Sequence, residues 1–259
     1  MPTLSENLHV WGRHNWSMNG DEWSNAWGGT TGMWYGVMLP RIHSWLPCRR
    51  LLEIAPGFGR WTQFLKDQAT HLMAVDLVAE CIEGCRERFS DSTHIEFFVN
   101  DGRSLSMIAD GSIDFAFSFD ALVHVQADVM QAYVHELGKK LAPDGVAFIH
   151  HSNLSGISRV PLALNWLADK HWRLAKLAPD LGWRDPSVSA PLVEQWCHDG
   201  GLVCRSQELV TWSSRHLTDC FSVMTPVRSK WARPNTVVRN PHFRPQMSDA
   251  VAACEQLYR

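Results

Sequence analysis

The sequence predicts an α/β fold around a mostly parallel sheet, and three observations lead to that prediction. Residues 51–55 form an apolar run with the length of a buried strand. The run breaks at Pro56-Gly57-Phe58-Gly59, and a helical apolar pattern follows directly. Three later apolar runs, 71–76, 95–99 and 113–120, each end at or beside an acidic residue. Strands that alternate with helices in this way are typical of a doubly wound fold.

The glycine turn after the first strand is suited to binding a ligand. Glycine at 57 and 59 leaves room beside the backbone, where a Cβ would stand in the way. The amides that open the next helix would point at the ligand, and Glu53 can accept hydrogen bonds from its hydroxyls or ammonium. The turn lacks full GxGxxG spacing and the Lys-Ser/Thr of a phosphate loop. By itself it therefore also fits an ordinary strand–helix connection.

Taken together, these motifs resemble a known family. Residues 50–151 look like a class I S-adenosylmethionine-dependent methyltransferase of the small-molecule or sugar methyltransferase type. The stretch 53–59 is similar to that family's first motif, and 141–149 is similar to its approach to strand five. One departure is Ala55, where the family most often has glycine. The resemblance implies a Rossmann-like seven-stranded sheet, mostly parallel with an antiparallel last strand, and S-adenosylmethionine as the cofactor.

The family's cofactor residues carry over to particular positions of this chain. Asp76 matches the acid that holds the ribose, and Asp101 matches the acid that faces the adenine. The segment from Ser118 to His124 matches the fourth-strand motif near the transferring methyl. The implied cofactor-binding residues are Glu53, Ala55, Gly57, Gly59, Asp76, Leu77, Asp101, Gly102 and Ser118.

We interpret 1–259 as a single domain with five segments. These are a Trp-rich N-terminal lid (1–49), a cofactor-binding core (50–151), a cap insertion after strand five (152–188), the end of the sheet (189–227) and a C-terminal tail (228–259). We expect helices near 59–68, 77–89, 126–141, 162–177 and 248–258, and an antiparallel pair of strands at 202–210 and 217–227. Ser189 is a good residue to cap the helix that opens there. The insertion could instead be a surface elaboration or a contact in a homodimer.

Tryptophan is unusually frequent, with 13 residues against three tyrosines. An indole offers a flat apolar face that stacks on sugar or aromatic rings, and an N–H that can donate. In the resembling family the N-terminal region commonly forms a lid over cofactor and substrate. The substrate-contact candidates are Trp16, Trp23 and Trp27 in the lid and Trp166 in the cap. The alternative is that these rings only pack the segments onto the core.

Histidines near the carboxyl ends of strands four and five are the candidate bases. A hydroxyl acceptor needs a base more than an amine does, and histidine titrates near neutrality. Side chains alternate along a strand, so only one of His150 and His151 should face the cleft. His150 matches by spacing a position that faces the active site in some of the resembling small-molecule methyltransferases, so we favour it, with His151 as second choice. His124 is a third candidate. Asp120 could orient a histidine, bind a substrate hydroxyl or help to hold a metal. Each histidine could also be a hydrogen-bonded packing residue.

Composition and sequence pattern disfavour several kinds of partner and ligand. The net charge of −3 disfavours nucleic acid, which usually demands a basic surface. No run approaches the ~20 apolar residues of a membrane span, and residues 1–10 hold no signal-peptide core. The seven scattered cysteines fit free thiols of a cytoplasmic protein. Asp120 and Asn153 could contribute to a magnesium site, but no second acid is evident, so we expect no metal.

We therefore expect a cytoplasmic methyltransferase that acts on a small-molecule or glycan acceptor. The favoured reaction is O-methylation with a histidine base, in natural product or polysaccharide biosynthesis. The first alternative is an N- or C-methyltransferase of an aromatic natural product, which would use the tryptophans for stacking. The second is a non-catalytic module that keeps the cofactor site. The basic stretch 228–245 could contact an anionic substrate, or it could be a solvated connector.

Overall fold

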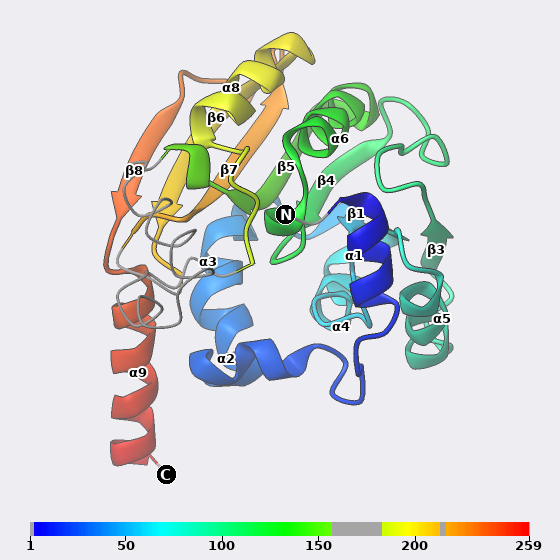
Figure 1. The fold of residues 1–259 in the computed structure, drawn as a ribbon. Coiled ribbons are helices and arrows are strands. Elements are labelled where there is room, and N and C mark those ends of the chain that lie inside the picture. The colour runs from blue at the N-terminus through cyan, green and yellow to red at the C-terminus, as the bar shows by residue number, and fades with distance from the viewer. Residues whose placement is uncertain (1–2, 157–182, 213–215, 259) are drawn as a thin grey trace.

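A computed structural model describes residues 3–156, 183–212 and 216–258. Its centre is an eight-stranded sheet in the order β3-β2-β1-β4-β5-β7-β6-β8 (Figure 1). The strands are β1 (Cys48–Ile54), β2 (Ala69–Asp76), β3 (Ile95–Val99), β4 (Ile113–Ser118), β5 (Leu141–Ser152), β6 (Leu202–Val210), β7 (Asp219–Pro226) and β8 (Thr236–Asn240). The first five strands are parallel, and β7 runs antiparallel to both β5 and β6. The predicted α/β class and the antiparallel pair are confirmed.

The sheet has one strand more than the predicted seven. β8 pairs in parallel with the outer side of β6, from Ser206 opposite Thr236 to Val210 opposite Asn240. This strand comes from the C-terminal tail, whose β-branched run Thr236-Val237-Val238 suits a strand. The tail thus completes the sheet instead of leaving it.

Helices flank the sheet, and most lie where the apolar patterns predict them. They are α1 (Leu4–Trp11), α2 (Gly29–Met33), α3 (Leu39–Ile42), α4 (Thr62–Leu65), α5 (Ala79–Arg88), α6 (Ala127–Lys140), α8 (Ala190–Asp199) and α9 (Phe243–Tyr258). Shorter helical turns are η1 (Asp21–Trp27), η2 (Trp34–Met38), η3 (His43–Trp45), η4 (Lys66–Gln68), η5 (Leu122–His124) and η6 (Leu154–Gly156). The predicted helix at 162–177 lies outside the described residues.

Two hydrophobic cores form, one on each face of the sheet, as expected for parallel strands buried on both sides. On one face, Val134 and Leu137 of α6 and Trp196 of α8 pack on the strands. On the other face, Val37 and Ile42 of the N-terminal segment pack on phenylalanines of β4, β5 and β7. The N-terminal segment is therefore built into the domain as one of its layers (Figure 1).

Asn153 holds the start of α8 in place of the predicted cap. Ser189 makes no side-chain cap bond. Instead Oδ1 of Asn153 accepts the N–H of Ala190 at 2.9 Å, while its Nδ2 donates to the carbonyl of Leu217 at 2.9 Å. Asn153 therefore links three segments through these two hydrogen bonds.

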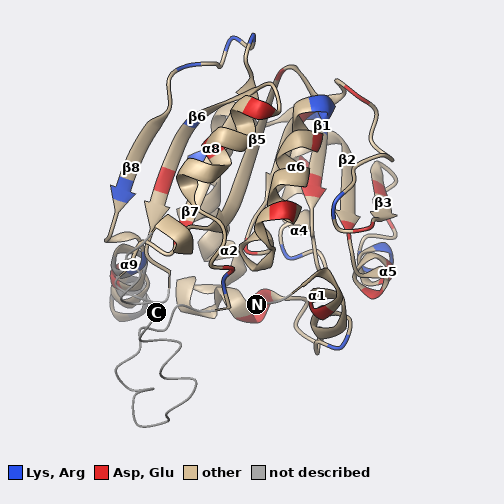
Figure 2. Cartoon of the chain, turned by 45° about the horizontal axis from the view of Figure 1, so that its top comes forward, with Lys and Arg blue, Asp and Glu red and all other residues tan. Residues whose placement is uncertain are grey.

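Charged residues of both signs are interspersed over the elements in Figure 2, in line with the net charge of −3. Within the described ranges, no helix combines the length and the apolar character needed to cross a membrane.

Candidate active site

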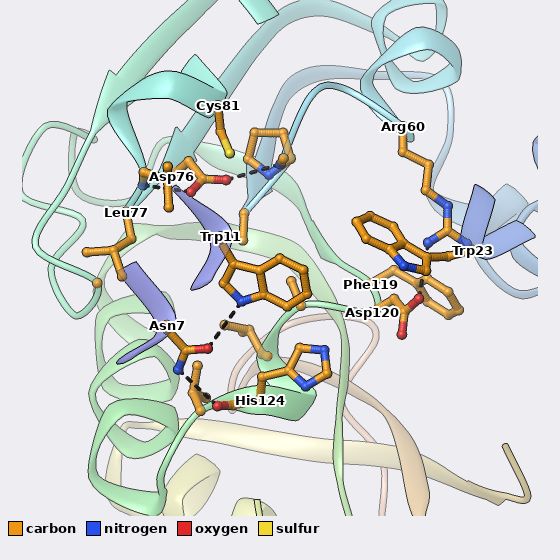
Figure 3. Close-up of a pocket in the computed structure, with 18 of the residues that line it drawn as sticks. Asn7, Trp11, Trp23, Arg60, Asp76, Leu77, Cys81, Phe119, Asp120 and His124 are labelled. Carbon is orange, nitrogen blue, oxygen red and sulfur yellow. Dashed lines mark hydrogen bonds and ion pairs between the residues drawn. The ribbon is translucent and has the colours of Figure 1, made fainter. Parts of the chain in front are cut away.

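A cavity of about 400 Å³ opens at the carboxyl ends of β1, β2 and β4 (Figure 3). This is the edge at which α/β sheets bind ligands, and the volume suits a small-molecule site. One side is lined by Ala55, Gly57, Asp76, Leu77, Val78, Cys81 and Gly102. The other is lined by Trp23, Arg60, Phe119, Asp120, His124, Trp183, Arg184 and Trp212, while Asn7 and Trp11 of α1 lie between the two sides. We call these the cofactor side and the acceptor side.

The turn after β1 is left-handed at alternate residues. Ala55 has φ 59°, Gly57 φ 57° and Gly59 φ 81°. The positive φ at Ala55 explains why glycine is common at this position in the resembling family, since a Cβ is disfavoured there. A Cβ on Gly57 would lie 3.0 Å from the ring of Trp16, so the missing side chain lets this ring pack closely on the turn.

Gly59 allows close packing between the turn and Phe89, and it does not make room for a ligand. A Cβ there would lie 2.4 Å from the ring of Phe89, and the residue is not part of the cavity wall. The expectation that Gly59 leaves room for the ligand is therefore wrong. Its missing side chain lets α5 approach the turn.

Asp76 lies at the cofactor side with its carboxylate aimed at the turn (Figure 3). Oδ2 accepts the N–H of Gly57 at 3.1 Å, and Oδ1 accepts the N–H of Val78 at 2.9 Å. Burial raises the pKa of Asp76 to about 6, and the backbone N–H groups counter it. Each carboxylate oxygen has a second lone pair. The side chain can therefore also accept the hydroxyl pair of a ribose.

Glu53 lies beneath the turn and not in the cavity wall. Its Oε2 accepts the hydroxyl of Thr62 at 2.6 Å, and its Oε1 has no partner within the described residues. Burial raises the pKa of Glu53 to about 8. The side chain is therefore mostly neutral at pH 7. This contradicts the prediction of a carboxylate that contacts the ligand directly.

Two other predicted cofactor residues are also placed elsewhere. Asp101 is exposed, and its Oδ1 accepts the N–H groups of Arg103 and Ser104, so it shapes the turn after β3. Ser118 is fully buried within β4. Neither lines the cavity, whereas the predicted Leu77 and Gly102 do. Asp101, two residues after β3, was the residue expected in the cavity wall, but Gly102 lies there instead.

Asp120 is the charged centre of the acceptor side. It is a non-glycine residue with φ 60°. Its Oδ2 accepts Nη1 of Arg60 at 3.1 Å, and its Oδ1 lies 3.9 Å from Nη2 of Arg184. Arg60 also donates through Nε to the hydroxyl of Ser24 at 3.0 Å, and its guanidinium lies 4.6 Å from the ring of Trp61. Arg60 therefore ties the N-terminal segment to the end of β4.

His150 does not face the cavity, and the prediction that it does is wrong. Its side chain is fully buried. Nδ1 accepts the N–H of Asp120 at 3.1 Å, so the proton of the neutral ring sits on Nε2, which donates to Oδ1 of Asp219 at 2.9 Å. Arg184 donates through Nε to the same oxygen at 2.9 Å. With both ring nitrogens engaged, His150 has no lone pair to offer a substrate.

His151 points to the other face of the sheet. It is fully buried, and its Nε2 lies 2.7 Å from the hydroxyl of Ser222. Burial lowers the pKa of His151 to about 4. Like His150, it is buried and does not line the cavity.

His124, the third candidate, does line the cavity. Its Nδ1 contacts the carbonyl oxygen of Trp183, which assigns the proton of the neutral ring to Nδ1 and the lone pair to Nε2. The ring lies 5.5 Å from that of Trp11 and 5.1 Å from that of Trp183. Burial, together with the charge of Arg184, lowers the pKa of His124 to about 4.

The four tryptophans predicted to contact substrate differ in where they lie. Trp16 and Trp23 line the cavity, and Trp16 stacks on Phe58 at 4.9 Å. Trp27 is buried in the core against Trp212 at 4.9 Å, so its expected substrate contact is wrong. Trp166 lies outside the described residues.

Several wall residues were not predicted. They are Asn7, Trp11, Arg60, Trp183, Arg184 and Trp212. Asn7 donates to the carbonyl of His124 at 3.1 Å and accepts from the indole of Trp11 at 3.2 Å (Figure 3). The capping box of Thr3 and Glu6 is a sequence signal for α1. No local signal marks that this helix closes the cavity.

Metal ligands are not clustered in the described part of the chain. There, no group of three or more His, Cys, Asp or Glu side chains could hold a metal ion.

Residues 51–145 match the family described as "Methyltransferase domain". Phosphoethanolamine N-methyltransferase 1 from Triticum aestivum is 30% identical over 118 residues, which cover 44% of this chain and 24% of that protein. The chain thus spans about a quarter of the length of this curated relative.

Solved structures share the fold. The PH0226 protein from Pyrococcus horikoshii OT3 has 17% identity and a TM-score of 0.55, covering 81% of this chain and 93% of that one. The DhpI–SAH complex has 18% identity and a TM-score of 0.54, covering 86% and 96%.

Proposed function

We propose that this chain, which carries a class I S-adenosylmethionine-dependent methyltransferase domain, transfers the cofactor's methyl group to a small-molecule or glycan acceptor. The main support for this proposal is the following observation. A single cavity joins Asp76, at the end of β2, to Asp120 and His124, which follow β4. A cofactor bound at Asp76 and an acceptor bound at Asp120 and His124 would meet inside this cavity.

The residues present on the cofactor side fit S-adenosylmethionine. Asp76 would accept the ribose hydroxyls, and Leu77 and Gly102 would flank the adenosine. The cofactor supplies a methyl group already activated on a sulfonium. The chain must hold the acceptor in line with that methyl and, for a hydroxyl, take up a proton.

For a hydroxyl acceptor, His124 replaces His150 as the proposed base. Burial lowers its pKa to about 4, so the Nε2 lone pair is free at pH 7, although the ring is a weaker base than an exposed histidine. The charge of Asp120 favours the imidazolium that forms. Arg60 donates a hydrogen bond to Asp120, and Asn7 donates one to the backbone carbonyl of His124. These bonds position the two groups.

An amine acceptor is the second candidate, favoured by a specific observation. The carboxylate of Asp120 lies in a wall that includes Trp23, Phe119 and Trp212. An ammonium group is attracted both by a carboxylate and by aromatic faces. The wheat relative is named as an N-methyltransferase of an amine. An amine also needs a base less than an alcohol does.

A methyl-transfer assay with labelled S-adenosylmethionine separates these possibilities. The acceptor panel would contain polyhydroxylated compounds, simple amines and flat aromatic amines. With a hydroxyl acceptor, His124→Ala should lower kcat by roughly 10²–10⁴-fold and leave S-adenosylhomocysteine affinity unchanged. With an amine acceptor, Asp120→Asn should raise KM while His124→Ala has a small effect. Cofactor binding without turnover of any acceptor would support a non-catalytic module.

A further inference from the structure

A second cavity, of about 520 Å³, lies on the α3 side of the sheet, between the N-terminal segment and β6, β7 and β8. We call it the β6 groove. Its wall includes Arg41, Trp45, Arg205, Phe221, Trp231 and Arg233. It shares no wall residue with the first cavity. Phe221 nevertheless lies 5.6 Å from Phe119 of the acceptor side, so a single layer of rings separates the two.

A β-bulge gives Arg205 its place in the groove. Cys204 pairs with Met224 and Ser206 pairs with Val223, so Arg205 is an extra residue in β6. A bulge re-aims the side chain of the extra residue. The guanidinium of Arg205 lies 5.6 Å from the ring of Trp45 and 5.9 Å from that of Trp231.

Positive charge in the groove is only partly neutralised. Arg41 binds Glu208 through two hydrogen bonds of 2.8 Å each. Arg205 and Arg233 form no ion pair with any described residue. Burial and the nearby charge of Arg233 lower the pKa of Arg205. The groove wall thus holds two like charges, and neither has an ion-pair partner among the described residues.

Hydrogen-bond donors are also left without acceptors. Nε and Nη1 of Arg205 and the indole N–H of Trp45 have no partner within the described ranges. Buried donors of this kind are costly and usually have a partner when a site is filled. The basic stretch after β7 supplies Arg233 and Trp231, so this segment completes a concave wall.

We propose that the β6 groove binds a small phosphate monoester. A phosphate monoester carries a charge of about −1.5 to −2 at pH 7 and three acceptor oxygens. That charge matches the two unpaired guanidinium groups, and the oxygens can accept from Arg205 and Trp45. A carboxylate would neutralise only one of the two charges. The site is separate from the methyl-transfer cavity and does not depend on the function proposed for it.

The test is a titration with methyl phosphate at constant ionic strength. Binding is followed by calorimetry and by the indole N–H signal of Trp45, assigned with Trp45→Phe. The wild-type chain should show saturable binding with a dissociation constant of about 1 mM or below. Arg205→Gln and the exposed Arg233→Gln should each weaken binding by tenfold or more. Arg239→Gln, in β8 but outside the groove wall, is the matched control and should bind like the wild type.

Thermal unfolding and S-adenosylhomocysteine affinity, measured on each variant, identify any loss of folding. Inorganic phosphate is a second probe, and binding as tight as that of methyl phosphate would mean that the groove takes free phosphate as well as the ester. Equal affinity for acetate would overturn the phosphate assignment. Non-saturable binding to the wild-type chain, or unchanged binding in both folded arginine variants, would overturn the site.

Discussion

The backbone N–H of Asp120 donates to Nδ1 of His150 across 3.1 Å. This bond reaches a residue whose φ of 60° is unusual for a side chain other than glycine. The opposite nitrogen of the ring is anchored on Asp219, which is fully buried. His150 therefore holds Asp120 in the conformation that presents its carboxylate to the cavity. The predicted base is a positioning residue.

His150→Ala should destabilise the protein. The change removes a buried ring, leaves the N–H of Asp120 without its acceptor and takes one donor from Asp219. We expect a loss of about 2–5 kcal/mol in the free energy of unfolding, measured by urea denaturation. His71→Ala, whose partly exposed ring lies 2.7 Å from a carboxylate oxygen of Glu96, is the control and should cost less than about 1 kcal/mol. Unchanged stability together with lost turnover would restore the base role of His150.

Ala55→Gly should stabilise the protein. Glycine adopts a φ of 59° without the steric cost that a Cβ incurs, and its greater freedom in the unfolded chain offsets part of the gain. The expected net change is an increase of about 0.5–1 kcal/mol, read from thermal unfolding. Ala79→Gly, at an exposed helical position in α5, should instead lower stability. A destabilised Ala55→Gly variant would contradict the strain inferred at this turn.

Asp76→Asn should weaken binding of S-adenosylhomocysteine by tenfold or more, because an amide accepts fewer hydrogen bonds than a carboxylate. In the wild-type chain, affinity should fall as the pH drops below about 6, where Asp76 becomes protonated. Asp101→Asn is a matched control, since Asp101 is exposed and outside the cavity wall. Equal affinity of Asp76→Asn and the wild-type chain would remove the ribose role.

Glu53→Gln should change how stability depends on pH. Burial raises the pKa of Glu53 from 4.5 to about 8, so between these values the native state binds more protons than the unfolded chain. Its contribution to stability therefore falls as the pH rises from about 4.5 to 8. Glu53→Gln cannot titrate, and its free energy of unfolding should decline less over this range. Parallel curves for the variant and the wild-type chain, measured by urea denaturation, would contradict the neutral form.

The sequence was a good guide where local pattern determines structure. The strand at 51–55, the turn at Gly57 and the acid at the end of β2 all lie as predicted, because apolar runs and glycine turns are local signals. Leu77 and Gly102 follow from the same strand ends.

The sequence was a poorer guide to whether a side chain points into the cavity or into the hydrophobic core. The sequence shows that His150 and His151 point in opposite directions. It does not show that α2 and α3 cover one face of β5 while α6 and α8 cover the other, so that both side chains are buried. Likewise Trp27 and Trp23 differ by four residues in the same turn, η1, yet only Trp23 lines the cavity. Arg60 and Arg184 are brought to Asp120 by tertiary contacts that no periodicity encodes.

The most direct test of the account is a calorimetric titration of the wild-type chain with S-adenosylhomocysteine, the demethylated form of the cofactor. We expect saturable one-to-one binding, because Asp76, Gly57 and Gly102 form one side of a single cavity. The absence of binding in a correctly folded sample would contradict the cofactor site and the methyl-transfer function built on it.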